Sequence, residues 1–289
     1  MDLLKHSREG QAKLEKQGKF DVAITPYSDD DTIPVDENYR YLTKNPGFLI
    51  SRGIVRALLF LLGPLVTKLV FNTKYYGREK LKPLKGKGFF TISNHCSFLD
   101  IVLNIRAVNH KSVYMTVAEF NNKKGFAGAV LRTGGILPIA TKPSAVKNMK
   151  NAFHTLIEKK KVVHFYAEAA MWLHYKKPRP MKRGAFYYAV QENSPVVPIF
   201  IRWTESKGLR KLFGIKEDAS IIILDPIYPK EGLSLKENTI YMQQQAQREY
   251  TENYREFFGV SKEEKPCIYD IDPEYMDSLD EETKYAASL

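Results

Sequence analysis

His95 and Asp100 are the residues whose types and spacing most clearly suggest acid–base chemistry. They lie in the stretch FFTISNHCSFLDIVLN, residues 89–104, in which an apolar run ends at Asn94-His95 and a helix-like run restarts near Leu99. A helix beginning at Phe98 would place Asp100 in its first turn, within reach of the imidazole. The carboxylate would then fix the tautomer of His95, which could act as a general base toward a substrate hydroxyl.

The same spacing also has a purely structural explanation. Ser97 and Asp100 are three residues apart, as in a capping box, and Asp100 would complement the positive end of the helix dipole. That explanation does not account for His95, which stands at the end of a predicted strand, where α/β sheets build their sites. Cys96 is expected to be inert filler. No serine lies in a nucleophile-elbow pattern, so direct proton removal is the simplest chemistry.

Around these residues, apolar patterning predicts an α/β domain with a mixed, largely parallel sheet flanked by helices. The predicted strands are 73–78, 88–94, 112–117, 135–140, 161–167, 196–203 and 219–225. The predicted helices are 98–109, 118–131, 144–159, 182–193 and 239–257. We expect an N-terminal extension over 1–45, membrane-associated helices over 46–72, the α/β domain over 73–260 and an acidic tail over 261–289. Both flanks are expected to pack poorly.

Charge narrows the class of partner. The 289 residues carry a net charge of +11, but residues 1–40 carry −3 and residues 261–289 carry −6, which leaves +20 on residues 41–260. A field of that size favours nucleic acid, an anionic membrane or an acidic carrier protein. We expect no nucleic-acid partner, because no recognition helix, zinc spacing or aromatic-basic motif is present. Cys96 and Cys267 fit no metal spacing and predict a reducing compartment.

The segment GFLISRGIVRALLFLLGPLVTKLVFN, residues 47–72, raises the membrane question. Its longest uncharged apolar run, Ala57–Thr67, is shorter than the roughly 20 residues needed to span a bilayer, and Pro64 should break or kink a helix. Arg52 and Arg56 are one turn apart and share a helix face. Two short helices in the membrane interface and a buried pair of core helices explain the pattern equally well.

The order of the motifs resembles the glycerolipid acyltransferases, the lysophosphatidic acid (1-acylglycerol-3-phosphate) acyltransferase family. Asn94-His95 followed by Asp100 resembles the family's first motif. LRTGGILPIATK, residues 131–142, resembles the second motif without its terminal arginine, for which Arg132 or Lys142 would have to substitute. PRPMKRGAFYYAVQENSPVVPI, residues 178–199, resembles the fourth. The resemblance covers roughly residues 50–230.

The third motif is a variant. HFYAEAAMW, residues 164–172, stands where the family has Phe-Pro-Glu-Gly-Thr-Arg, and only Glu168 is retained. A branch of the family with Tyr-Pro-Glu-Gln-x-Met-Trp is similar at Tyr166, Glu168, Met171 and Trp172. Alanines at 167 and 169 depart even from that branch.

The resemblance implies transfer of a fatty acyl group from acyl-CoA or an acidic acyl carrier protein to the hydroxyl of a lysolipid. It also implies an amphipathic helix pair on the membrane, which favours the interfacial interpretation of residues 47–72 and a peripheral or monotopic protein on a cytoplasmic membrane face. The thioester would be a co-substrate, so we expect no bound cofactor and no metal. His95 and Asp100 would be catalytic, with substrate contacts from Asn94, Arg132, Gly134, Gly135, Glu168, Lys182 and Arg183.

Two of these assignments have alternatives. Backbone N–H groups of Gly134-Gly135 could stabilise the tetrahedral oxyanion, although a simple turn is the favoured interpretation. In HYKKPRPMKRGAF, residues 174–186, Lys182 and Arg183 could bind a substrate phosphate at a helix N-terminus, or the loop could simply be solvated. The chain as a whole could instead be a decayed lipid- or anion-binding relative, or a hydrolase in which His95 activates water.

Overall fold

The structure, a computed structural model, describes residues 3–24, 30–108, 113–215, 217–263 and 268–289, and Cys267 lies outside them. Its strands are β1 (Lys74–Tyr76), β2 (Phe89–Ser93), β3 (Val113–Val117), β4 (Ile136–Pro138), β5 (Val162–Tyr166), β6 (Val196–Glu205) and β7 (Glu217–Ile223). Its α-helices are α1 (Leu3–Lys16), α2 (Pro46–Phe71), α3 (Asp100–Val108), α4 (Gly125–Gly134), α5 (Pro143–Glu158), α6 (Gly184–Gln191), α7 (Leu209–Leu212), α8 (Leu235–Phe258) and α9 (Glu281–Ser288). Short 3-10 helices are η1 (Arg78–Leu84), η2 (Glu119–Asn121) and η3 (Pro273–Ser278).

Within the described ranges, seven strands form one sheet in the order β1-β7-β6-β2-β5-β3-β4. Neighbouring strands run parallel except β6 and β7, which are antiparallel. The predicted mixed, largely parallel α/β sheet is therefore confirmed. One predicted helix, 118–131, is divided into η2 and α4, because the chain turns at Gly125, whose φ is 69°.

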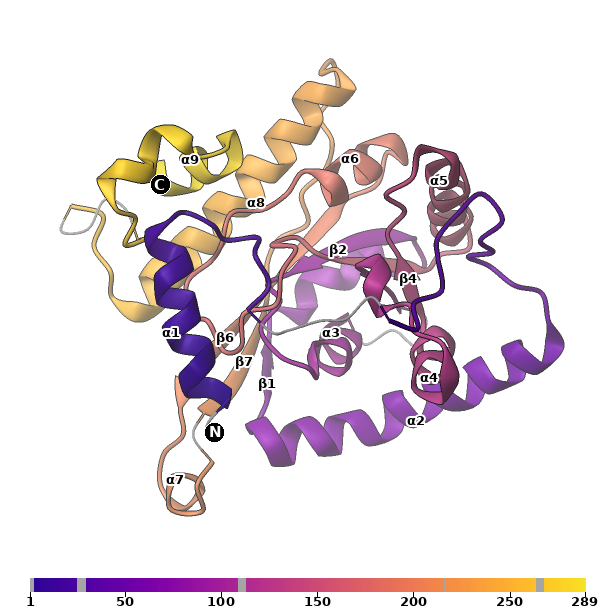
Figure 1. The fold of residues 1–289 in the computed structure, drawn as a ribbon, viewed down its shortest axis with the longest axis horizontal. Helices are drawn as coiled ribbons and strands as arrows, with labels where there is room; N and C mark the ends of the chain where they lie inside the picture. Colours follow the sequence, from indigo (N-terminus) through magenta and orange to yellow (C-terminus); the bar gives the residue numbers. More distant parts are fainter. Residues whose placement is uncertain (1–2, 25–29, 109–112, 216, 264–267) are drawn as a thin grey trace.

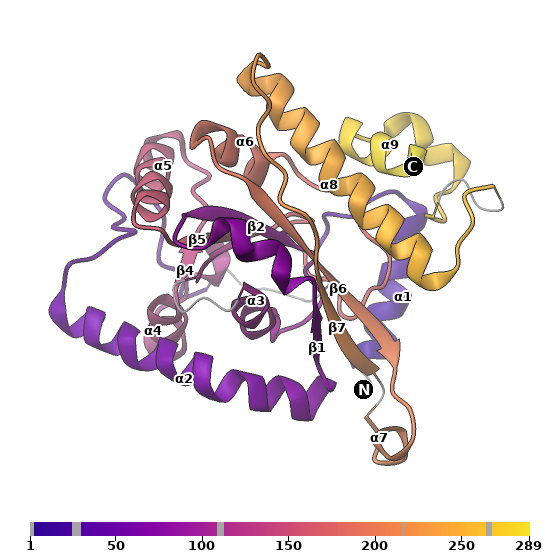
Figure 2. The same ribbon diagram turned by 180° about the vertical axis from the view of Figure 1, so that it is seen from behind.

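Helices cover both faces of the sheet because successive strand residues point to opposite sides. On one face, Phe90 and Ile92 of β2 pack with α5, α6 and α8. On the other face, Phe89 packs with α3 and with the inner side of α2. Figures 1 and 2 show the two helical layers on either side of the strands. β2 is central, so the residues that follow it emerge from the best-packed part of the domain.

The predicted pair of membrane helices is a single helix, α2, with Pro64 inside it. Asn45 caps its start by accepting a hydrogen bond from the Phe48 N–H, and Pro46 occupies its first turn. A proline removes one backbone hydrogen bond. The helix nevertheless continues past Pro64, because a long helical segment precedes it and because α2 contacts α3, α4 and β7.

α2 is apolar on its exposed side, which is unusual for a helix on a protein surface. Its inner side carries Arg52, Arg56, Gly63 and Thr67 beside apolar residues that pack on the core, whereas its outer side carries exposed leucines. We call this outer side the apolar face of α2; its exposed leucines are Leu58, Leu61, Leu62, Leu65 and Leu69. By length and composition α2 is a candidate membrane span, but it lies along the domain and contacts it (Figure 1).

Both flanks of the chain are well packed where they are described, contrary to the expectation of poor packing. Phe20 from the N-terminal flank stacks on Trp172, with ring centroids 5.8 Å apart, and contacts Tyr269 from the C-terminal flank. Ala286 and Ala287 of α9 belong to the same apolar cluster. The acidic sequence of these flanks concealed a few large apolar residues that are sufficient to hold them on the domain.

Two glycines of α2 provide a matched test of its packing. A Cβ added at Gly63 would lie 2.4 Å from Cγ1 of Val102 in α3, whereas at Gly53 it would meet nothing within 4 Å. Alanine at Gly53 should therefore stabilise the protein by about 0.5–1 kcal/mol, the usual helical gain. Alanine at Gly63 should lower the free energy of unfolding, because β-branched Val102 cannot easily move away. Urea unfolding of both variants measures this, and equal stabilisation by both would contradict the close approach of α2 to α3.

Candidate active site

His95 lies in the loop between β2 and α3, at the carboxyl end of the sheet's central strand. Its Nδ1 is 2.8 Å from Oδ2 of Asp100, the first residue of α3. The His95 side chain is 23% exposed, whereas that of Asp100 is 1% exposed. Within the described part of the chain, Nε2 of His95 has no hydrogen-bond partner. Asp100 thus orients the imidazole from the protein interior, and Nε2 of His95 stays open to a substrate.

One oxygen of Asp100 serves both the histidine and the loop. Oδ2 also accepts the backbone N–H groups of Cys96, at 2.8 Å, and Ser97, at 3.0 Å. The helix starts at Asp100, two residues later than predicted, and Ser97 Oγ accepts the Leu99 N–H instead of completing a capping box. The structural and the catalytic interpretations of Asp100 are therefore both met by one carboxylate, which fixes the backbone of the loop and also orients His95.

Tyr166, at the end of the neighbouring strand β5, lies flat against the imidazole of His95. The ring centroids are 3.9 Å apart and the planes are inclined by 16°. Sequence reasoning had noted Tyr166 only as part of a motif. Its position two residues before Glu168, at the end of the predicted strand 161–167, is the signal that could have placed it near His95.

A buried histidine, His164, lies beneath this pair. Its Nδ1 is 2.8 Å from Thr91 Oγ1 and its Nε2 is 3.2 Å from Ser93 Oγ, both on β2. Burial, with a smaller contribution from the charge of His95, lowers the pKa of His164 to about 3. The ring is therefore neutral and joins the two strands that carry His95 and Tyr166.

Glu168 is held by a buried arginine that sequence reasoning had placed in a solvated or anion-binding loop. Arg179 contacts Oε2 of Glu168 at 2.8 Å, and its backbone N–H donates to Oε1 at 2.7 Å. The same guanidinium donates to the carbonyl oxygens of Phe20, Ala170 and His95. Burial raises the pKa of Glu168, and Arg179 opposes that rise. This pair supports the backbone of the His95 loop.

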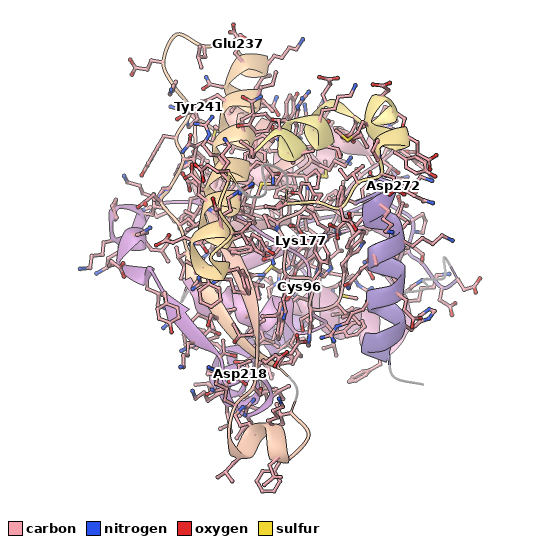
Figure 3. All side chains as sticks on the ribbon, turned by 90° about the vertical axis from the view of Figure 1, so that its left-hand side faces the viewer. Cys96, Lys177, Asp218, Glu237, Tyr241 and Asp272 are labelled. Carbon is pink, nitrogen blue, oxygen red and sulfur yellow. The ribbon has the colours of Figure 1, made fainter. Side chains whose placement is uncertain are left out.

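Asn94 and Cys96, the neighbours of His95, both point into the protein. The Asn94 side chain exchanges two hydrogen bonds with the backbone of Ile201 in β6, at 2.8 and 2.9 Å. Burial, and then the charge of Asp100, raise the pKa of the Cys96 thiol well above its usual value. Cys96 is buried, and Figure 3 marks its place in the middle of that view. Asn94 is therefore a clamp between strands, and Cys96 is the inert residue that the sequence predicted.

Arg132, Gly134 and Gly135 precede the edge strand β4, three strands from the central strand β2 that leads to His95. The strand register pairs Thr91 of β2, through β5 and β3, with Ile136 of β4. Gly135 therefore lies one residue toward the amino ends of the parallel strands from this row, whereas His95 lies four residues toward their carboxyl ends. With about 3.3 Å per residue and about 4.8 Å per strand, roughly 20 Å separate Gly135 from His95. Instead, Gly135 ends α4 with φ 111°, and Arg132 donates to the Lys123 carbonyl and lines a cavity of about 810 Å³. This distance argues against the predicted oxyanion role of the two glycines, and the left-handed conformation of Gly135 at the end of α4 favours the turn interpretation.

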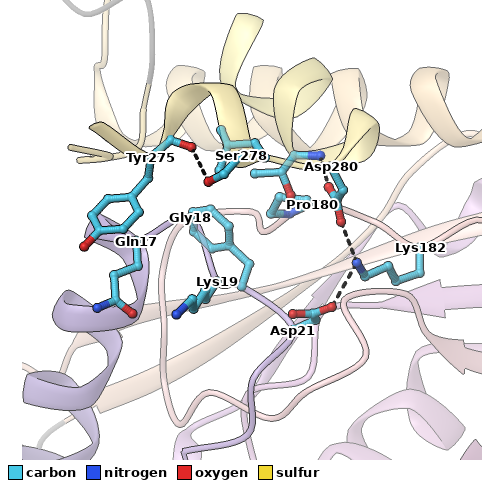
Figure 4. Close-up of a pocket in the computed structure, with 12 residues that line it drawn as sticks. Gln17, Gly18, Lys19, Asp21, Pro180, Lys182, Tyr275, Ser278 and Asp280 are labelled. Atoms are coloured by element: carbon cyan, nitrogen blue, oxygen red, sulfur yellow. Dashed lines mark hydrogen bonds and ion pairs between the residues drawn. The ribbon is translucent and has the colours of Figure 1, made fainter. Parts of the chain in front are cut away.

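Lys182 and Arg183 are paired with acidic residues of the two flanks. Lys182 Nζ is 3.0 Å from Asp21 and 2.9 Å from Asp280, and Arg183 Nε is 3.2 Å from Glu282. Figure 4 shows Lys182 between the two aspartates, beside a cavity of about 220 Å³ built from both flanks. The geometry favours a structural role for these cations over the predicted substrate-phosphate site.

Comparison with known proteins agrees with the motifs. Residues 72–202 match the sequence model of the family described as Acyltransferase. No curated protein matches the chain at a significant level. Among solved structures, the 1-acyl-sn-glycerophosphate (LPA) acyltransferase PlsC of Thermotoga maritima is similar with a TM-score of 0.52 and 17% identity. The match covers 76% of this chain and 86% of that one, and it shows a shared fold.

Replacing Arg179 by Met should strongly destabilise the protein. The change leaves the Glu168 carboxylate buried without its cation and removes the Arg179 donor from the carbonyls of Phe20 and Ala170, and breaking a buried pair costs about 3–5 kcal/mol. Adding Glu168→Gln should restore part of that loss, because the unpaired charge is removed. Urea unfolding of the single and double variants checks this; a loss below about 1 kcal/mol for Arg179→Met would show that the pair does not support the site.

His164 should make the protein less stable in acid. Its native pKa of about 3 lies below that of a free histidine, so between about pH 6.5 and pH 3 the unfolded state binds more protons than the native state. The free energy of unfolding should then fall with falling pH, by up to about 1.4 kcal/mol per unit from this group. In His164→Gln this slope should be smaller. Parallel pH profiles of stability for the two proteins would contradict a neutral, buried His164.

Proposed function

We propose that this chain, whose residues 72–202 match the model of the family described as Acyltransferase, moves a fatty acyl group from a thioester to the hydroxyl of a lysolipid. The observation that carries the proposal is the 2.8 Å contact between His95 Nδ1 and the buried Asp100 carboxylate, with the outer nitrogen open. This arrangement prepares an imidazole to accept one proton from a substrate that approaches the end of β2.

In the proposed reaction, Nε2 of His95 takes the proton of the acceptor hydroxyl as its oxygen attacks the thioester carbonyl. The tetrahedral intermediate then collapses, the C–S bond breaks, and the thiolate leaves with a proton from the imidazolium. Asp100 stabilises the cationic ring through Nδ1–H, and Tyr166 stacks against it. Cys96 takes no covalent part, because burial raises its thiol pKa.

The proposed donor is acyl-CoA or an acidic acyl carrier protein, both of which the +20 charge of residues 41–260 would attract. The proposed acceptor is a lysolipid, as the motif resemblance implies. Support for a phosphate on that acceptor is weaker, because Lys182 and Arg183 are already paired and Arg132 lies at the far edge of the sheet.

The proposed location is the cytoplasmic face of a membrane, with α2 lying in the interface. The polarity of α2 supports this, since its arginines face the protein and its apolar face is exposed. Arg56 donates to the Val113 carbonyl, and Arg52 contacts the Tyr114 hydroxyl. A helix whose leucines face outward gains stability by entering the acyl-chain boundary of a bilayer.

Replacing His95 by Ala should reduce acyl transfer by roughly 10²–10⁴-fold or more while the protein stays folded, because the side chain is a general base and is partly exposed. Asp100→Asn should also lower kcat heavily, because an amide cannot orient and stabilise the imidazolium as the carboxylate does. Cys96→Ser is the matched control in the same loop and should retain turnover. The assay follows a labelled acyl thioester into a diacyl product by thin-layer chromatography.

Three outcomes would contradict the proposal. Near-normal transfer by the His95→Ala protein would remove the general base from the mechanism. Release of free fatty acid by the wild-type protein, with no diacyl product at any acceptor supplied, would favour the hydrolase interpretation. Binding of lysolipid without turnover would favour a decayed relative.

A further inference from the structure

The turn between β6 and β7 carries large apolar side chains that are exposed to solvent. It contains the short helix α7, and Leu209, Leu212 and Phe213 on it are 71%, 79% and 76% exposed. We call these three side chains the α7 tip. Figures 1 and 2 show α7 projecting beyond the sheet at the lower end of the molecule. Large apolar side chains gathered at a projecting turn are typical of a contact surface.

The α7 turn is fixed to the end of α2. Arg210 donates to the carbonyl oxygens of Leu69 and Val70, both at 3.0 Å, where a cation also complements the helix dipole. Its Nε contacts Asp218 at 3.0 Å, and Asn72, the C-terminal cap of α2, donates to the other carboxylate oxygen at 2.9 Å. Figure 3 shows Asp218 close to α7.

The α7 tip and the apolar face of α2 lie on one side of the molecule. In both Figure 1 and Figure 2, α2 runs along the lower edge and α7 lies below its C-terminal end. Leu61 and Leu69 of α2 are 70% and 63% exposed. The Arg210 contacts therefore place two exposed apolar elements, far apart in sequence, next to each other.

Charge around the tip indicates which partner fits. Residues 206–215, SKGLRKLFGI, contain Lys207, Arg210 and Lys211 and no acidic residue. Lysines beside leucine and phenylalanine are the composition of elements that enter anionic lipid surfaces. Three side chains on a narrow turn are also far fewer than the 20–30 residues per partner that a stable protein interface uses.

We propose that the α7 tip is a second membrane anchor, which inserts Leu209, Leu212 and Phe213 into an anionic bilayer beside α2. The proposal rests on the proposed membrane location of α2 but not on the proposed chemistry. Contact at α2 alone leaves the domain free to rotate about the helix axis. A second contact, tied through Arg210, fixes that rotation and so the orientation of the sheet relative to the lipid.

Partition of the full chain onto vesicles tests this. We would compare vesicles of phosphatidylcholine alone and with phosphatidylglycerol, using wild type, Leu209→Ser/Leu212→Ser/Phe213→Ser and the matched control Leu233→Ser/Leu235→Ser. The control residues are exposed at the start of α8, the opposite end of the molecule from α7 (Figure 1). The tip variant should bind anionic vesicles about tenfold more weakly or worse, and the control should bind like wild type.

A fluorescent probe separates insertion from misfolding. With Cys96 and Cys267 replaced by Ser, nitrobenzoxadiazole attached at Leu212→Cys should shift its emission to the blue with anionic vesicles, and the same label at Leu233→Cys should not. No shift at 212, or wild-type affinity of the tip variant, would overturn the proposal. So would a wild-type dimer that the tip variant dissociates while vesicle binding is unchanged. Partition needs no turnover, so an inactive chain that still binds through the tip would contradict only the proposed reaction.

Discussion

The carboxylate of Asp100 is the constraint on which the site depends. A single buried oxygen accepts Nδ1–H of His95 and the backbone N–H groups of Cys96 and Ser97. The strand-to-helix turn and the orientation of the imidazole therefore have the same cause. Because this oxygen is anionic, the bonds that it accepts are also stronger than bonds between neutral groups. The catalytic geometry is in this sense part of the fold.

A second layer of contacts fixes what surrounds the dyad. Tyr166 covers one side of the ring. The backbone carbonyl of His95 accepts the backbone N–H of Trp172 and a guanidinium N–H of Arg179. Arg179 also reaches Phe20, so the N-terminal flank contributes to the support of the His95 loop. The acidic flanks and the basic domain are therefore electrostatic partners as well as packed neighbours, since Lys182 and Arg183 use carboxylates from both.

The sequence was informative where one local pattern decided the outcome. Short apolar runs located the strands, and the His95–Asp100 spacing located the dyad. It was uninformative where partners are distant: the Arg179–Glu168 pair depends on how residues 168–180 fold back on themselves, and the packing of the flanks depends on a few apolar residues among many charges. The motif suggested Gly134 and Gly135 for the site, but the predicted strand 135–140 already placed them at its amino end, and in a parallel sheet that end lies away from the loop that carries His95. Pro64 failed to divide α2 because tertiary contacts outweighed one lost hydrogen bond.

The central claim is that Asp100 holds His95 with Nδ1 protonated and Nε2 free to accept a proton. Nitrogen-15 NMR of the imidazole side chains, assigned by comparison with the His95→Ala protein, observes this directly in the neutral form. The account predicts that His95 is the Nδ1–H tautomer in the wild-type protein and loses that preference in Asp100→Asn. A His95 found as the Nε2–H tautomer in the wild-type protein would contradict it, because that nitrogen could not then act as the base.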